Sequence, residues 1–163
     1  MDGSWILNHY QGSEAFLGWL VLQPSRHVME LTDLTEDAAK ALGPNIKRID
    51  EALRGYWKET FPEDPIERVY VVYFFESAYE WPPSGYHLHL HLIARPRCFR
   101  GLQRNGSSLV GWRIHDVKTH PCFPVKYRPV EENVSNLMNA LRERLDAGIT
   151  RPGSGRTRPH RAH

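Results

Sequence analysis

The feature that most constrains this chain is the run GYHLHLHLIARP at residues 85–96, in which histidine and leucine alternate three times. Successive side chains of a β-strand point to opposite faces of the sheet, so a strand here would place its three leucines on one face. The three histidines would share the other face, and they are His87, His89 and His91. The pattern therefore predicts a strand with one face packed on a hydrophobic core and the other lining a cleft.

The rest of the chain predicts further strands. Short runs rich in apolar, β-branched and aromatic residues are bounded by turn residues, as is typical of strands. The predicted strands are residues 4–10, 16–24, 68–76 and 109–114.

Two helical segments complete the expected fold. Apolar residues at spacings of three or four predict a long helix within residues 31–61. Thr35 is a suitable N-cap, and Gly43-Pro44 interrupts the middle, so we expect one kinked helix or two abutting helices. Residues 130–148 predict a closing amphipathic helix that ends at Gly148. Strands and helices in this order predict an α+β fold, with a mainly antiparallel sheet and the helices mainly on one face.

The composition is typical of one soluble domain. A chain of 163 residues can bury a core, and a formal net charge of +2 gives little reason to expect a nucleic-acid-binding protein. We find no signal peptide and no run of 18 apolar residues, and the two cysteines lack a CxxC spacing, so we expect a cytoplasmic protein. We expect one domain at residues 1–148 and a disordered basic tail at residues 149–163, rich in glycine, proline and arginine.

The three histidines admit three interpretations. They can be incidental polar residues on a solvated face. Two of them can ligate a metal ion such as zinc, although no spacing marks a complete ligand set. The further ligands would have to come from Glu76, His115, His120 or Cys122. One histidine can instead attack phosphorus, because imidazole has a pKa of about 6.5 and is largely neutral near pH 7, while a neighbouring imidazole donates a hydrogen bond to developing charge.

The run HLHLHLI resembles the His-φ-His-φ-His-φ-φ signature of the histidine triad superfamily of nucleotide hydrolases and transferases, where φ is apolar. The upstream run GWLVLQPSRHVMELTDLTEDAAKAL resembles the second strand and the helix start of the same family. The two motifs stand in the family's order, and the resemblance covers roughly residues 5–97. It implies a mainly antiparallel sheet with a long kinked helix and a C-terminal helix packed on it.

The resemblance also implies a role for each histidine. By that match His89 attacks the α-phosphorus and forms a nucleotidyl-histidine intermediate. His91 would contact the phosphate oxygens, and His87 would buttress the nucleophile through hydrogen bonding. Ser84, just before the triad, matches a position that often reaches the phosphate or the leaving group, and a buried structural role in its turn is the alternative.

Two positions near the N-terminus carry further implications of the resemblance. Asn8 resembles a first-strand asparagine that commonly lies near the ribose, whereas an ungapped alignment would choose Gln11. Trp19 stands where a fourth histidine usually follows the glycine of the second strand. Tryptophan has one donor and no acceptor, so a relay through this position to His87 is lost or altered. The indole then either fills the gap or stacks on a ligand.

Glu76 departs from the family pattern, which usually has asparagine or glutamine near the phosphates. A carboxylate about 6 Å from a phosphate would cost on the order of 3 kcal/mol at an effective dielectric of about 20. A metal ion, an amine on the substrate or an arginine would have to offset that repulsion. The candidate arginines are Arg26, Arg95 and Arg97. We therefore expect Glu76 to shift the substrate preference away from ordinary dinucleoside polyphosphates.

The resemblance as a whole implies a nucleotide hydrolase or nucleotidyl transferase that acts on a nucleotide or nucleotide-conjugate small molecule, in a homodimer. No cofactor is required for the first step, although a divalent metal is compatible with it because metal use varies in the family. Two alternatives remain. One is a nucleotide-binding or interaction protein of the same fold with little turnover, and the other is a metal-dependent enzyme that uses the histidine strand as ligands.

Overall fold

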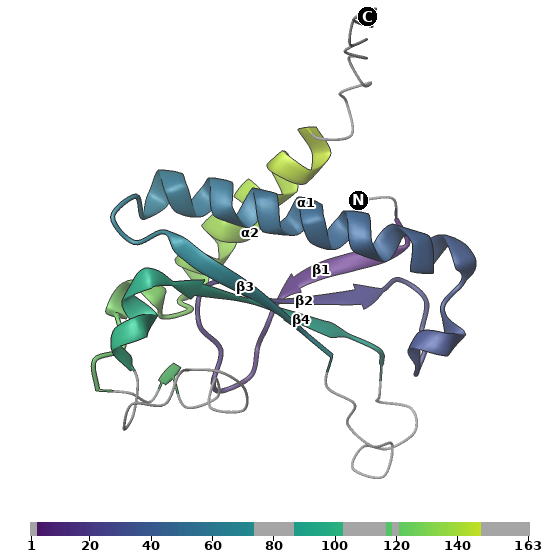
Figure 1. The fold of residues 1–163 in the computed structure, drawn as a ribbon, viewed down its shortest axis with the longest axis horizontal. Helices are drawn as coiled ribbons and strands as arrows, with labels where there is room; N and C mark the ends of the chain where they lie inside the picture. The colour runs from purple at the N-terminus through teal and green to yellow at the C-terminus, as the bar shows by residue number, and fades with distance from the viewer. Residues whose placement is uncertain (1–2, 74–86, 103–116, 119–120, 148–163) are drawn as a thin grey trace, which may run out of the picture.

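A four-stranded antiparallel sheet forms the centre of the computed structural model, which describes residues 3–73, 87–102, 117–118 and 121–147 (Figure 1). The strand order across the sheet is β1-β2-β4-β3, and every neighbouring pair is antiparallel. The strands are β1 Trp5–His9, β2 Trp19–Pro24, β3 Ile66–Val72 and β4 Leu90–Pro96.

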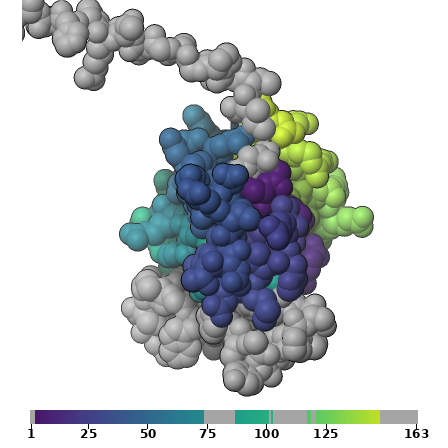
Figure 2. Space-filling view, turned by 90° about the vertical axis from the view of Figure 1, so that its right-hand side faces the viewer, coloured from purple at the N-terminus to yellow at the C-terminus, as the bar shows by residue number. Residues whose placement is uncertain are grey.

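Two α-helices lie together on one side of this sheet (Figure 1). They are α1 Glu36–Thr60 and α2 Glu131–Ala147. Short 3-10 helices in the described part of the chain include η1 Leu31–Asp33, η2 Arg97–Leu102 and η4 Val125–Tyr127. Helix α2 packs against both α1 and the edge strand β1. Figure 2 shows residues near the N-terminus between the start of α1 and the residues of α2. The sheet and its helices confirm the predicted α+β class.

Helix α1 begins where the sequence predicts and runs on without a break. The Thr35 side chain accepts a hydrogen bond of 3.3 Å from the backbone N–H of Ala38, as an N-cap does. The helix then continues through Pro44, so the alternative of two abutting helices is wrong. Pro44 and Lys40 both lie on the exposed side of the helix. Pro44 has no N–H to donate to the carbonyl of Lys40, four residues earlier in the helix. That carbonyl therefore faces away from the core.

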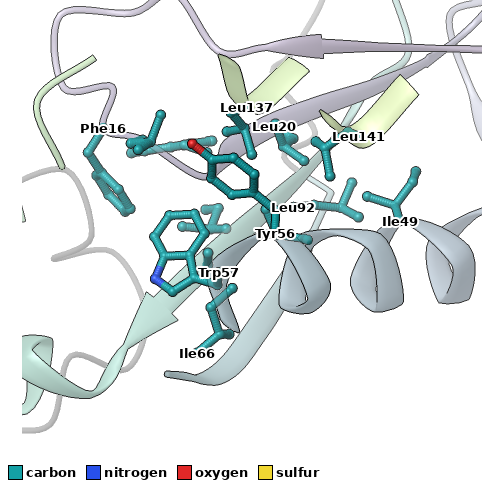
Figure 3. Packing of buried hydrophobic residues seen from close by; sticks show 14 of the residues in the cluster. Phe16, Leu20, Ile49, Tyr56, Trp57, Ile66, Leu92, Leu137 and Leu141 are labelled. Atoms are coloured by element: carbon teal, nitrogen blue, oxygen red, sulfur yellow. The ribbon is translucent and has the colours of Figure 1, made fainter. Parts of the chain in front are cut away.

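The hydrophobic core fills the space between the sheet and the helices (Figure 3). The leucine side of β4 takes part in it, with Leu92 fully buried, and this confirms that the leucine face meets the helices. Buried residues of this core on the other elements include Leu20, Ile49, Trp57, Leu137 and Leu141. Because α1 and α2 both contribute, the side of the sheet opposite the histidines is sealed from solvent.

A buried carboxylate ties three connecting segments together. Asp64, 5% exposed, accepts hydrogen bonds from the backbone N–H of Cys98 at 2.8 Å and from the Tyr127 hydroxyl at 2.6 Å. Burial alone would raise the pKa of Asp64, but these bonds and the charge of Lys126 outweigh burial and lower it. Burial and the same carboxylate raise the pKa of Cys98 to about 12, so this thiol is unreactive. The cluster holds η2 and η4 against the turn before β3.

The histidine strand begins later than the alternation predicts. β4 starts at Leu90, so His91 lies in the strand while His87 and His89 precede it, and the prediction of a strand through all three histidines is wrong. The alternation of burial nevertheless continues, because Leu88 is fully buried between two half-buried histidines.

The reason lies in the neighbouring strand. Leu90 pairs with Leu22, but β2 ends two residues later at Pro24, a residue with no N–H for a ladder. The backbone N–H of Leu88 instead donates to the carbonyl of Val28 at 2.8 Å. The chain before β4 is therefore held by single hydrogen bonds to the segment after β2.

Some predictions lie outside the described residues. They are the strand at 109–114, the helix end at Gly148 and the tail at 149–163. Within the described part of the chain, no helix is both long and apolar enough to cross a bilayer.

Candidate active site

A row of paired residues crosses the sheet at the level of His91. Asn8 pairs with Val21, Val21 with His91, and His91 with Val72. Paired residues of adjacent strands share a face, so Asn8 lies on the face of His91, two strands and about 10 Å away. The exposed Asn8 side chain can thus reach a ligand bound over the histidines.

Gln11 occupies a different environment. It lies beyond the end of β1, and its side-chain Nε2 donates to the carbonyl of His9 at 3.3 Å. It also lines a cavity of about 340 Å³ together with Tyr10 and Ser135 of α2. The geometry therefore favours Asn8 over Gln11 as the residue beside the triad.

His91 is buried, at 4% exposure. Tyr10 and Trp19 cover it, with ring centroids 5.1 and 5.8 Å from its own, and these two rings stack on each other at 4.7 Å. Aromatic side chains thus cover the histidine face at this residue. Sequence reasoning missed Tyr10, because it follows the end of β1 and no periodic pattern marks it.

Trp19 donates the hydrogen bond that replaces the expected relay. Its indole Nε1 lies 2.8 Å from Nδ1 of His91, so the bond reaches this histidine and not His87. The indole is fully buried, which leaves no surface on which a ligand could stack. Of the two alternatives for Trp19, the structure favours the one in which the side chain fills the gap.

His89 is oriented by the backbone. Its Nδ1 lies 2.8 Å from the carbonyl oxygen of His87, and the ring centroids of His89 and His91 are 4.9 Å apart. A carbonyl oxygen only accepts hydrogen bonds, so Nδ1 of His89 must carry the proton. In the neutral ring the lone pair then lies on Nε2. The ring is half-buried, and the arrangement leaves Nε2 on the side away from the backbone.

His87 supports His89 in a way that differs from the expectation. Its imidazole Nε2 donates to the carbonyl of Pro24 at 3.0 Å, and the support for His89 comes from the His87 carbonyl. Burial lowers the pKa of His87, and the charges of His27 and His89 act in the same direction. The ring of His27 lies 5.2 Å from that of His87. His27 follows β2 in the sequence, and the fold brings it beside the triad.

Neither a comparison with protein-family models nor one with curated proteins finds a match for this chain. Among solved structures, the chain is similar to a histidine triad protein from Bradyrhizobium japonicum, with a TM-score of 0.52 and 22% identity over 86% of this chain and 84% of that chain. The chain has the histidine triad fold.

Two further solved structures are similar at lower TM-scores. One is a zinc-bound histidine triad family protein from Mycobacterium smegmatis, with a TM-score of 0.45 and 21% identity over 86% of both chains. The other is a HIT-like protein involved in cell-cycle regulation from Bartonella henselae, with a TM-score of 0.47 and 19% identity over 88% of this chain and 82% of that chain. At these identities the similarity concerns the fold alone.

Several predicted site residues lie outside the part of the chain that the structure describes. They are Glu76, Ser84, His115 and His120. Cys122 is exposed. Among the described residues, no group of three or more histidines, cysteines or carboxylates is arranged to hold a metal ion.

The three arginines considered as partners of Glu76 differ in their surroundings. Arg95 already pairs with Glu67 at 3.2 Å and donates to the Tyr70 hydroxyl at 3.0 Å. Arg26 and Arg97 are exposed. The charge of Arg95 is balanced by the Glu67 carboxylate of β3. Arg26 and Arg97 are therefore better suited than Arg95 to meet an anionic group.

Proposed function

We propose that this protein is a nucleotide hydrolase or nucleotidyl transferase in which His89 attacks the α-phosphorus of its substrate. The Nε2 lone pair forms the N–P bond while the P–O bond to the leaving group breaks, and the leaving group departs with the bonding electrons. Water or another acceptor then attacks phosphorus, the N–P bond breaks, and its electron pair returns to His89.

The observation that carries this proposal is the hydrogen bond between Nδ1 of His89 and the His87 carbonyl. A nucleophilic imidazole needs a lone pair on the nitrogen that faces the substrate, and this bond places the lone pair on Nε2. The backbone bond from Leu88 to Val28 and the buried Leu88 side chain hold the segment in place. The nucleophile is therefore positioned before the substrate arrives, which is how a site of tight geometry gains rate.

The roles proposed for the neighbours of His89 are those that the resemblance implies, and their positions are compatible with these roles. His91, with its ring centroid 4.9 Å away, hydrogen-bonds the phosphate oxygens as charge develops. Asn8 lies on the same face of the sheet and contacts the ribose. We keep Ser84 as a contact to the phosphate or leaving group and Glu76 as a selector of substrate, and both remain predictions.

The decisive experiment is a search for the covalent intermediate. Purified protein is incubated with α-labelled adenylyl and guanylyl substrates, quenched, and analysed for label by intact mass. We expect a nucleotidyl adduct on the native protein and none on His89→Ala. The control is His27→Ala, which removes an exposed imidazole near the triad and should keep the adduct. The decay of the adduct with different acceptors then distinguishes a hydrolase from a transferase.

The alternative outcome is equally specific. If no substrate produces an adduct or product while calorimetry still measures nucleotide binding, the catalytic proposal is wrong and the protein is a nucleotide-binding module. Loss of activity on chelation, restored by a divalent cation, would favour the metal-dependent alternative. Pairing into a homodimer remains a prediction, which light scattering of the eluting protein can test.

A further inference from the structure

Trp19 and His91 form a buried side-chain pair in which only Trp19 can donate the hydrogen bond. The indole Nε1 lies 2.8 Å from Nδ1 of the imidazole, with Trp19 fully buried and His91 4% exposed. An indole N–H is a donor and has no acceptor. The imidazole Nδ1 must therefore present a lone pair to it, and in a neutral ring the single proton then lies on Nε2.

Protonation of His91 would break this arrangement. An imidazolium carries a proton on both nitrogens, so its Nδ1–H would face the indole N–H at 2.8 Å as a second donor. Neither ring can turn away freely, because Tyr10 stacks on Trp19 at 4.7 Å and the edge of its ring contacts His91. A histidine at position 19 would behave differently, since its ring can either donate or accept and so tolerates both states of its partner.

We propose that Trp19 is a positioning residue that holds His91 as a neutral imidazole with its proton on Nε2. His91 is then a hydrogen-bond donor to the phosphoryl oxygens at every pH at which the protein works, and it does not act as a cation. The inference deepens the proposed function and rests on it for its catalytic meaning. The tautomer itself follows from the Trp19–His91 pair whether or not the protein turns over a nucleotide.

The groups around His91 fit this assignment. His91 pairs with Val21 of β2 and with Val72 of β3, and neither valine carries a charge. Among the described residues, titratable rings in contact with it include His89, before β4, and Tyr10, after β1. The hydroxyl of Tyr10 donates to the carboxylate of Glu14 at 2.6 Å, which orients that charge toward the phenol. A carboxylate aimed at the ring would instead favour the imidazolium.

A consequence for the reaction follows from the two tautomers together. His89 carries its proton on Nδ1 and His91 carries its proton on Nε2, so one ring offers a lone pair and its neighbour offers a donor. The two rings therefore present complementary groups to a phosphoryl centre.

The test is nuclear magnetic resonance of protein labelled with ¹⁵N on the histidine rings, with His91→Gln used to assign the His91 signals. We expect the Nδ1 of His91 to be unprotonated and Nε2 protonated from about pH 5.5 to about pH 8, the range in which imidazoles titrate. In Trp19→Phe we expect His91 to titrate or to mix tautomers. The single-turnover rate of nucleotidyl transfer should fall about tenfold, the loss expected for one hydrogen bond, with nucleotide affinity unchanged.

The control is Trp57→Phe, which makes the same substitution at a fully buried tryptophan of α1. It should leave the His91 tautomer and the transfer rate as they are. A native protein with a proton on Nδ1 of His91, or with His91 titrating between about pH 6 and about pH 7, would overturn the proposal. So would a Trp19→Phe variant with an unchanged tautomer. The native spectrum decides the matter even if that variant fails to fold, and it does so independently of whether an adduct forms on His89.

Discussion

Replacing Gly18 with alanine should destabilise the fold beside the candidate site. Gly18 has φ +91°, a conformation that side-chain-bearing residues rarely adopt. A Cβ there would lie 2.9 Å from the Trp57 ring and 3.0 Å from the Cβ of Ala94. The backbone cannot move aside easily, because the Gly18 carbonyl accepts from the N–H of Ala94 at 3.0 Å. The glycine therefore permits α1 and β4 to approach at this point.

Three contributions set the size of the effect, two that destabilise the variant and one that stabilises it. The left-handed backbone costs an alanine about 1–2 kcal/mol relative to glycine. The overlap with the buried Trp57 adds about 1–3 kcal/mol, the usual range for overpacking a rigid core. Alanine also restricts the unfolded chain, which returns about 0.4–1 kcal/mol. The free energy of unfolding should thus fall by about 1–4.5 kcal/mol.

Urea unfolding followed by fluorescence measures this loss, and the chain offers a matched control. Gly43 is exposed within α1, and a Cβ added there meets no atom within 4 Å. Gly43→Ala should stabilise the protein by about 0.5–1 kcal/mol through helix propensity. The same chemical change is thus expected to have opposite signs at the two glycines. A loss below about 1 kcal/mol for Gly18→Ala would refute the steric reasoning.

Two further predictions concern buried polar groups. Tyr127→Phe removes the 2.6 Å hydrogen bond to the buried Asp64 carboxylate and should lower the free energy of unfolding by about 1.5–3 kcal/mol; an unchanged urea midpoint would contradict this. Stability should also fall as the pH drops below about 6.5, because burial lowers the pKa of both His9 and His87, so the unfolded chain binds protons that the folded protein refuses. Unfolding at about pH 7.5 and about pH 5.5 checks the second prediction. His9→Gln should narrow the difference between the two, and equal midpoints for the native protein would rule the linkage out.

Local patterns were sufficient to predict much of the fold. The spacing of apolar residues identified α1, α2 and the core side of each, because burial on one face of a helix imposes that spacing. The alternation of histidine and leucine predicted which side of β4 meets the helices, because burial on one face of a strand imposes alternation. It misplaced the start of β4 because a strand also needs a partner, and the partner ends at Pro24.

The sequence predicted only part of the candidate site. The alternating motif singled out His87, His89 and His91 and their order, since alternation is a property of consecutive residues. The bond between Trp19 and His91 joins residues 72 positions apart, and it exists only because β2 and β4 pair in one register. A slip of one residue would turn Trp19 to the helix side of the sheet.

The sequence by itself determined the residue types that can do chemistry here, namely a line of imidazoles with apolar residues between them. The tertiary structure decided which nitrogen of each ring carries a proton. His89 takes its tautomer from the His87 carbonyl, and His91 takes its tautomer from an indole on the neighbouring strand. A ring's proton goes where its hydrogen-bond partners allow, and those partners are brought together by backbone pairing and packing that no local pattern encodes.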